Sequence, residues 1–200
     1  MKLYSHPGSC SSSVHIALLE TDLDYEIIKV NLFGDRMLED GRNFNDVNPK
    51  GYVPLLELDN GELLTEISAI MQYIADKQPD SGLLPASGSL QRLRVLEWLS
   101  YLNSEVHMTM GLFFKPELEG PMRELATQKL KTRLAYIDQH LASNDYLFAE
   151  RFSVADAYLY MITTWPALFE MDISEFKNIT AYQARLNSRP SVEKALAEMG

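Results

Sequence analysis

Cys10 is the single cysteine of the 200-residue chain, and its position suits thiol chemistry. It follows the Pro7-Gly8 turn, at the point where the sequence predicts the start of a helix. Free N–H groups and the positive dipole end at a helix N-terminus favour a thiolate. Ser13 completes a Cys-x-x-Ser spacing, the one-thiol form of a redox pattern. Cys10 is therefore a candidate catalytic thiol, and the alternative is a small buried apolar residue.

Two further features suggest a peptide-like ligand. Pro54 stands at the start of a predicted strand, where a proline without a backbone donor is tolerated. In thioredoxin-like domains the proline at this point is cis and leaves the preceding backbone free for a peptide-like ligand, and the alternative is an ordinary trans proline. Glu66 lies between a predicted strand and the helix that begins at Ile67. N–H groups at that helix start can hold a carboxylate, while Glu66 can pair with an amine. The alternative for Glu66 is an acid that only complements the helix dipole.

A polar stripe marks the predicted helix after residue 90. Its members are spaced i, i+3, i+4 and i+7, and they are small and uncharged apart from one histidine: Ser100, Asn103, Ser104 and His107. A solvated face usually carries Lys and Glu. The stripe therefore predicts a partly buried wall that faces another domain or a ligand, and the alternative is a plain surface face.

The elements that must position these residues fall into two groups. The pattern of residues 1–80 predicts a strand, a helix and a second strand, followed by a connection. Two further strands, joined by the turn Asp59-Asn60-Gly61, and a helix complete this part. This order is that of an α/β thioredoxin-like domain. A segment rich in Pro, Gly and Ser follows, with the linker at 81–88. Residues 89–200 predict an all-α domain, in which Ser153 and Asp156 have the spacing of a capping box.

Composition narrows the classes of partner. The net charge of −10 disfavours nucleic acid and anionic membrane surfaces as partners. The sequence shows no secretion-type N-terminus and no apolar stretch of about 18 residues, so we expect a cytoplasmic protein. One cysteine and four histidines leave no cysteine pair for a disulfide and no Cys/His cluster for zinc.

The chain resembles the beta-class bacterial glutathione S-transferases over essentially its whole length. The matching stretches include VNPKGYVP at 47–54, AIMQYIAD at 69–76 and RFSVADAY at 151–158. Shorter matches occur at 1–4, 7–11, 64–66, 97–99, 105–107 and 189–190. These motifs are specific in combination, and their order and spacing also fit the family.

The resemblance implies a role for each candidate residue. Cys10 and His107 would be the groups near the sulfur of glutathione, the co-substrate. The backbone of Val53, before a cis Pro54, would pair with the cysteinyl part. Glu66 and the helix start at Ile67 would hold the γ-glutamyl end. Ser100, Asn103 and Ser104 complete the expected glutathione-binding residues, and family members are homodimers.

Three departures from the family pattern concern glutathione binding. Ile67 stands where a Gly or Ser is usual, so a hydroxyl contact is absent. Gly34-Asp35-Arg36 replaces a loop that often carries a Lys for the glycyl end, and we expect Arg36 to substitute. Ser100 stands where Asn is common. None of these changes affects Cys10 or His107.

Three functions fit these residues. The main hypothesis is conjugation of glutathione to small hydrophobic electrophiles in detoxification, with an apolar pocket lined by Met108, Met110, Phe113 and Trp165. The second is glutathione-dependent thiol exchange or peroxide reduction at Cys10. The third is a non-catalytic binding or regulatory protein of the same fold.

Overall fold

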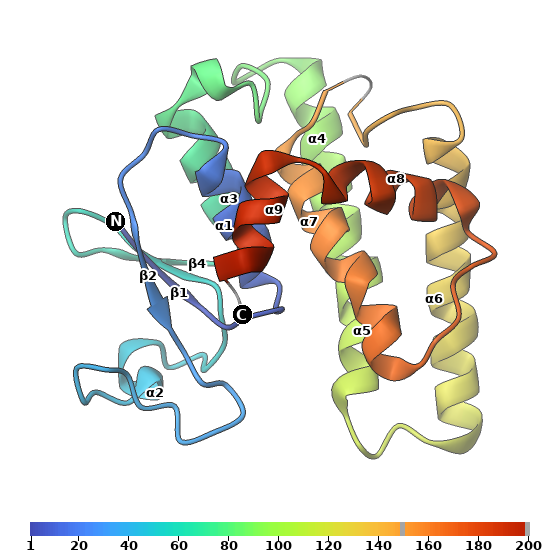
Figure 1. Ribbon diagram of the computed structural model, residues 1–200, viewed down its shortest axis with the longest axis horizontal. Coiled ribbons are helices and arrows are strands. Elements are labelled where there is room, and N and C mark those ends of the chain that lie inside the picture. The colour runs from blue at the N-terminus through green and yellow to red at the C-terminus, as the bar shows by residue number, and fades with distance from the viewer. Residues whose placement is uncertain (149–150, 199–200) are drawn as a thin grey trace. The chain divides into compact units, whose positions relative to one another are not determined.

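The computed structural model describes residues 1–148 and 151–198, which form two compact units (Figure 1). The first unit comprises residues 1–83 together with helix α9 (Pro190–Glu198), and the second comprises residues 84–189. The sequence placed everything after residue 88 in the helical domain. The structure groups α9 with the first unit instead, because α9 packs against α1 (Ser11–Leu19).

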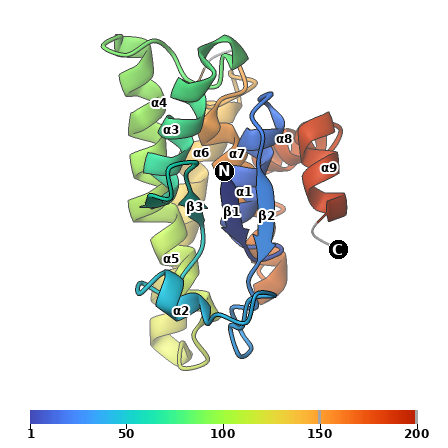
Figure 2. The ribbon, with the colours of Figure 1, turned by 90° about the vertical axis from the view of Figure 1, so that its left-hand side faces the viewer.

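The first unit contains a four-stranded sheet in the order β2-β1-β3-β4. Figure 2 shows β1 between β2 and β3. β1 pairs in parallel with β2, and both β1–β3 and β3–β4 are antiparallel, as the thioredoxin-like order requires. The strands are β1 (Lys2–Ser5), β2 (Glu26–Lys29), β3 (Leu55–Glu57) and β4 (Leu63–Thr65). The helices besides α1 and α9 are α2 (Phe44–Val47), α3 (Ile67–Lys77) and the 3-10 segment η1 (Pro79–Ser81).

Strand β1 is buried on both faces, as expected for a central strand. Leu3 and Tyr4 alternate across it, and both are fully buried. Tyr4 packs against Phe44 of α2, with ring centroids 5.9 Å apart. This small core, which also includes Val53 and Leu55, fixes the segment between α2 and β3 close to β1.

Helix α9 completes the first unit. Val192 and Ala195 are fully buried, the Ser191 hydroxyl bonds to the Glu20 carboxylate, and His15 Nε2 lies 3.1 Å from Glu198 Oε2. His15 is buried, and burial lowers its pKa. The side chain therefore serves packing between α1 and α9.

The second unit is helical, with α4 packed against α7 and α6 against α8 (Figure 1). Apolar side chains at helical spacing are buried here, including Val95, Leu99, Leu134 and Ile137. Its α-helices are α4 (Leu90–Tyr101), α5 (Met108–Gly111), α6 (Gly120–Leu141), α7 (Val154–Thr164) and α8 (Lys177–Asn187). Between them lie a π-helical turn η2 (Leu102–His107) and the 3-10 segments η3 (Leu112–Phe114) and η4 (Trp165–Phe169).

The capping box expected at the start of α7 is confirmed. Ser153 donates from its N–H and its hydroxyl to Asp156 Oδ2, at 2.9 and 2.7 Å. Asp156 Oδ1 accepts from the Leu147 N–H at 2.8 Å and from the Tyr182 hydroxyl at 3.1 Å. Burial raises the pKa of Asp156 to about 6, against the opposing effect of these hydrogen bonds. One carboxylate thus holds α7, α8 and the preceding loop together.

Candidate functional site

Cys10 occupies the N-cap position of α1, directly after the predicted turn. The turn is closed by a hydrogen bond from the Ser9 N–H to the His6 carbonyl at 3.1 Å. The Cys10 thiol is buried and donates to the carbonyl oxygen of Val53, 3.5 Å away. The fold therefore brings together two residues, 43 positions apart, that the sequence had separately proposed as site residues.

The thiol of Cys10 is protonated at neutral pH in this environment. Burial raises its pKa to about 12, although the N–H groups of Cys10 and Ser11 act in the opposite direction. The sequence predicted that the helix N-terminus favours a thiolate. Desolvation outweighs that effect here, because a buried charge loses its hydration while only two backbone donors face it.

The serines around Cys10 bond mainly to the turn itself. The Ser11 hydroxyl lies 2.7 Å from both the Ser5 and the Ser9 hydroxyls and accepts from the His6 N–H at 3.1 Å. The Ser13 hydroxyl donates to the Cys10 carbonyl at 2.6 Å. These contacts fix the turn that carries Cys10. Ser5, at the end of β1, also belongs to this network.

The peptide bond between Val53 and Pro54 is cis, as the resemblance implied. The Val53 carbonyl is engaged by the Cys10 thiol. Among residues 1–148 and 151–198, nothing accepts a hydrogen bond from the Val53 N–H. An extended peptide can therefore pair with this backbone at the start of β3.

Glu66 has a prearranged carboxylate. Its Oε1 accepts from Lys50 Nζ at 2.6 Å and from the Tyr52 hydroxyl at 2.8 Å. The hydrogen bond from Lys50, followed by that from Tyr52, lowers the pKa of Glu66, so the group is ionised at neutral pH. Both partners belong to the segment that leads into the cis proline, and the sequence had not assigned either of them a role.

Helix α3 begins directly after Glu66, whose φ of 71° turns the chain into the helix. The Glu66 carbonyl accepts from the N–H groups of Ala69 and Ile70, each at 3.0 Å. This arrangement leaves the N–H groups of Ile67 and Ser68 without an acceptor in the described part of the chain. The Ile67 side chain is buried, so only its backbone is available to a ligand.

Arg36 braces the same segment from outside the sheet. Its Nη1 donates to the carbonyl of Gly51 at 2.8 Å and to Asn45 Oδ1 at 2.9 Å. Gly51 has φ +70°, and a Cβ there would lie 2.9 Å from that nitrogen, so this position requires glycine. Arg36 thus has a structural function in addition to the carboxylate contact that the sequence predicted.

The polar stripe of α4 is divided by the π-helical turn η2. A π-turn is wider than an α-turn, so it shifts the residues that follow it around the axis. Asn103 and His107 both meet Tyr158 of α7, whereas the Ser104 hydroxyl donates back to the Ser100 carbonyl at 2.9 Å. Both serines are exposed. The four residues therefore do not form a single wall: Asn103 and His107 contact Tyr158, whereas Ser100 and Ser104 face solvent.

His107 is held by two aromatic residues. Its Nδ1 lies 2.5 Å from the Tyr158 hydroxyl, and its ring meets Trp165 edge-to-face at 4.9 Å between centroids. Burial lowers the pKa of His107 to about 4, so the imidazole is neutral at neutral pH. A neutral imidazole carries a lone pair that can accept a hydrogen bond or a proton from a thiol, and the lowered pKa makes it a weaker base than an ordinary histidine.

The residues proposed as pocket walls differ in exposure. Met110, Phe113 and Trp165 are buried, so they belong to the core of the second unit. Met108 is 66% exposed and is free to contact a ligand. Phe114 was not part of the prediction, but it is 45% exposed and stacks edge-to-face on Trp165 at 5.4 Å. Met108 and Phe114, together with Leu112, are thus accessible apolar side chains near His107 in the sequence.

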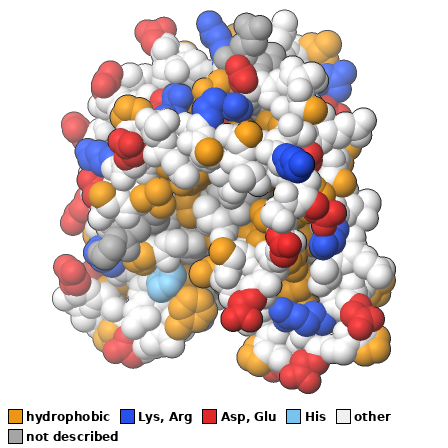
Figure 3. Space-filling model, turned by 45° about the vertical axis from the view of Figure 1, so that its right-hand side comes forward, with side chains coloured by type: hydrophobic (Ala, Val, Ile, Leu, Met, Phe, Trp, Pro, Cys, Tyr) orange, Lys and Arg blue, Asp and Glu red, His pale blue; other side chains and the backbone are white. Residues whose placement is uncertain are grey.

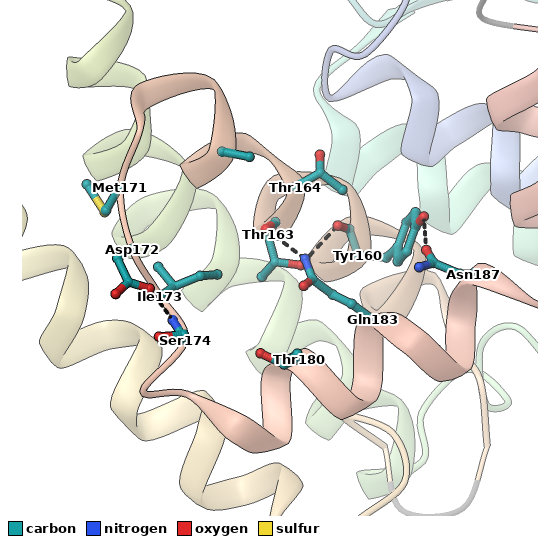
Figure 4. Close-up of a pocket in the computed structure, with 11 residues that line it drawn as sticks. Tyr160, Thr163, Thr164, Met171, Asp172, Ile173, Ser174, Thr180, Gln183 and Asn187 are labelled. Atoms are coloured by element: carbon teal, nitrogen blue, oxygen red, sulfur yellow. Dashed lines mark hydrogen bonds between the residues drawn. The ribbon is translucent and has the colours of Figure 1, made fainter.

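Other features of the described residues suggest no different chemistry. A pocket of about 490 Å³ lies between α7, η4 and α8, but its polar groups bond to one another: the Tyr160 hydroxyl to Asn187 and Gln183 to the Thr163 carbonyl (Figure 4).

Residues 1–148 and 151–198 contain no cluster of three metal-ligating side chains. No helix among them is long and apolar enough to span a membrane. Acidic and basic side chains are interspersed on the face drawn in Figure 3.

Comparison with known proteins identifies the family of the chain. Residues 8–77 match the family described as glutathione S-transferase, N-terminal domain, and residues 98–190 match glutathione S-transferase, C-terminal domain. The chain is 38% identical to glutathione S-transferase GstA of Escherichia coli O157:H7, over 100% of this chain and 99% of that protein.

Two solved structures extend the comparison. A sphingomonad glutathione S-transferase complexed with glutathione is 45% identical, with a TM-score of 0.95 over 100% of this chain and 99% of that one. A beta-class enzyme from Sphingomonas chungbukensis is 42% identical, with a TM-score of 0.94 over the same shares. The predicted resemblance and fold are confirmed, and the chain belongs to the glutathione S-transferase family.

Proposed function

We propose that this protein conjugates reduced glutathione to small hydrophobic electrophiles. The observation that carries the proposal is the set of backbone and side-chain groups in the first unit: the free Val53 N–H, the ionised Glu66 and the open N–H groups of Ile67 and Ser68. Glutathione offers the matching groups, which are a peptide bond, an ammonium and a carboxylate. The sphingomonad relative was crystallised with this tripeptide.

Each predicted binding residue has a place in this proposal. The Val53 backbone pairs with the cysteinyl part, and Glu66 with the γ-glutamyl ammonium. The Ile67 N–H binds the γ-glutamyl carboxylate. Arg36 uses Nη1 for the protein itself, so Nε and Nη2 remain for the glycyl carboxylate. Ser100, Asn103 and Ser104 supply polar contacts from the second unit.

The chemistry follows from the protonation states of Cys10 and His107. The reaction needs the glutathione thiol to lose its proton before sulfur attacks the electrophile. A neutral His107 accepts a proton, and the protonated Cys10 thiol turns from the Val53 carbonyl to the bound tripeptide, where its hydrogen bond stabilises the thiolate. The electrophile then receives the sulfur electron pair, and its leaving group departs.

This protonation state favours conjugation over thiol exchange. Exchange or peroxide reduction at Cys10 requires its thiolate, and the buried thiol has a pKa of about 12. A non-catalytic role is not favoured, since the relatives in the comparison are named as transferases. We also propose a cytoplasmic homodimer with a role in detoxification, as the family resemblance implies.

The test combines binding, mass and activity. Purified protein is applied to immobilised glutathione and assayed for conjugation of reduced glutathione to 1-chloro-2,4-dinitrobenzene and related aryl and alkyl halides. Intact mass is measured after incubation with oxidised glutathione, for wild type and Cys10→Ala. Retention with conjugation and little adduct supports the proposal. A rapid Cys10-dependent adduct without conjugation would move the assignment to thiol exchange, and absence of retention would contradict glutathione binding.

A further inference from the structure

Tyr158 joins two of the proposed site residues. Its hydroxyl lies 2.5 Å from His107 Nδ1 and donates to Asn103 Oδ1 at 3.2 Å. The Tyr158 side chain is fully buried, and its ring meets the imidazole edge-to-face at 5.8 Å between centroids. It comes from α7, 51 residues after His107 in the sequence, and the capping box at Ser153 and Asp156 fixes the start of that helix.

Counting protons along this chain of bonds determines the state of the histidine. A tyrosine hydroxyl has one proton to donate. Because that proton is directed to Asn103 Oδ1, the hydroxyl oxygen must accept from His107, so the imidazole proton resides on Nδ1. The hydrogen bond made by one ring nitrogen sets the role of the other. Nε2 of the neutral ring therefore carries a free lone pair.

We propose that Tyr158 is a positioning residue that, together with Asn103, fixes His107 as the Nδ1–H tautomer and so keeps Nε2 available as the proton acceptor of the transferase reaction. This inference rests on the proposed function for its catalytic consequence. The tautomer itself is a property of the free protein. A second orientation of the Asn103 amide would offer N–H to the hydroxyl and reverse both bonds, placing the proton on Nε2. The orientation of one exposed amide thus decides the form of a half-buried histidine.

Asn103 therefore has two roles, one in ligand binding and one in fixing the tautomer of His107. A ligand that accepts a hydrogen bond from Asn103 Nδ2 holds the amide with Oδ1 towards Tyr158. The same contact therefore binds the ligand and fixes the proton on His107 Nδ1. Ser104, which bonds to the Ser100 carbonyl, has no such connection to the imidazole.

The first experiment reads the tautomer directly. Long-range ¹H–¹⁵N correlation spectra of uniformly ¹⁵N-labelled full-length protein at pH 7 separate protonated from unprotonated ring nitrogens. The chain has four histidines, and His107→Gln assigns the relevant signal. We expect Nδ1 to be protonated in the wild type. If Nε2 is the protonated nitrogen of wild-type His107 both in the free protein and in the presence of glutathione, the proposal is overturned, whatever the catalytic activity.

The second experiment uses matched variants. Tyr158→Phe removes the hydroxyl, and Tyr160→Phe is the control because it removes an equally buried hydroxyl bond, to Asn187 at 2.7 Å, from the same helix. We expect Tyr158→Phe to lower kcat about tenfold with little change in the KM for glutathione, since general-base effects are about 10²–10⁴-fold and the base itself remains. Tyr160→Phe should keep the wild-type kcat and tautomer. Equal kcat and equal spectra in both variants would contradict the positioning role.

Asn103 variants keep the test valid if Tyr158→Phe does not fold. Asn103→Ala removes the acceptor, so the tyrosine proton turns to His107 and the spectra should show Nε2–H. Asn103→Asp retains an acceptor and should restore the Nδ1–H form. An Asn103→Ala spectrum identical to that of wild type would argue against the relay. A wild type that has the expected tautomer but no transferase activity would refute the proposed function and leave the relay intact.

Discussion

The thiol of Cys10 donates to the Val53 carbonyl across 3.5 Å, at the residue that precedes the cis proline. This bond joins the reactive group to the backbone that we assign to the peptide of glutathione. Binding there places the tripeptide backbone beside a protonated thiol and not beside a thiolate. The ground state of the free protein is thus unreactive at Cys10, and this can be measured.

We predict that Cys10 resists alkylation in the folded protein. With a pKa of about 12, its thiolate fraction at pH 8 is about 10⁻⁴, so iodoacetamide should label it at least about a hundredfold more slowly than in the unfolded chain. Mass spectrometry over time, with and without 6 M guanidinium (about the concentration that unfolds stable domains), gives both rates. Labelling at similar rates would mean that the thiol is exposed or ionised.

Replacement of Glu66 by Gln should weaken glutathione binding specifically. The amide keeps the size of the side chain but loses the charge that attracts an ammonium, so we expect the KM for glutathione to rise about tenfold, or about 1.4 kcal/mol. Des-amino glutathione, which lacks that ammonium, should bind wild type and variant equally. Unequal binding of the des-amino compound would remove Glu66 from the amine contact.

Lys50→Met tests whether Glu66 needs its partner. Lys131→Met is a matched control, because Lys131 makes an exposed ion pair of the same 2.6 Å length with Glu175. Both variants should lose less than about 1 kcal/mol of stability, as surface ion pairs do. Only Lys50→Met should raise the KM for glutathione. An equal KM in the two variants would show that Tyr52 alone suffices to hold the carboxylate.

The lowered pKa of His107 predicts a specific loss of stability in acid. Between the unfolded value of 6.5 and the folded value of about 4, the unfolded chain binds the proton more readily, so the free energy of unfolding falls as the pH falls through this window. The contribution to the free energy of unfolding is about 3 kcal/mol in full. Urea titrations at pH 7 and pH 4.5 give the free energy of unfolding at each pH, and it should fall by more in wild type than in His107→Gln. An equal fall in the two proteins would contradict the burial of a neutral imidazole.

Loss of the Asp156 carboxylate should destabilise the helical unit more than loss of its Ser153 partner. Ser153→Ala removes one cap, at a cost of about 1 kcal/mol. Asp156→Ala leaves the Ser153 N–H and the Leu147 N–H buried without their acceptor, at about 3 kcal/mol or more, while the Tyr182 hydroxyl keeps the backbone carbonyl of residue 156. Thermal unfolding followed by circular dichroism shows which variant loses more stability. Equal losses in the two variants would show that the capping box acts only as a helix cap.

Much of the fold was predictable because local patterns determined it. The turn before Cys10, the Asn60-Gly61 hairpin, the proline at position 54 and the capping box each depend on residues close in sequence, and each appears in the structure. The thioredoxin-like order then followed from the sequence of elements. The burial of the apolar side chains in the second unit followed from their helical spacing.

The remaining features depend on long-range packing. The partners of His107 and Glu66 lie 51 and 14–16 residues away, at distances that periodicity does not address. The π-turn of Leu102–His107 shifts the phase of the polar stripe, which an α-helical period cannot predict. The protonation state of Cys10 depends on packing in the same way, because burial raises its pKa by more than the nearby helix start lowers it.

The return of α9 to the first unit has a consequence for synthesis on the ribosome. The four strands and α1 emerge early, yet the helix that covers the α1 face with Val192 and Ala195 is translated only after the whole second unit. During that interval the nascent first unit presents an apolar surface that no local segment can cover. A stalled or shortened chain that ends before residue 190 would carry this surface permanently, which makes it a natural substrate for chaperones that bind exposed apolar helices.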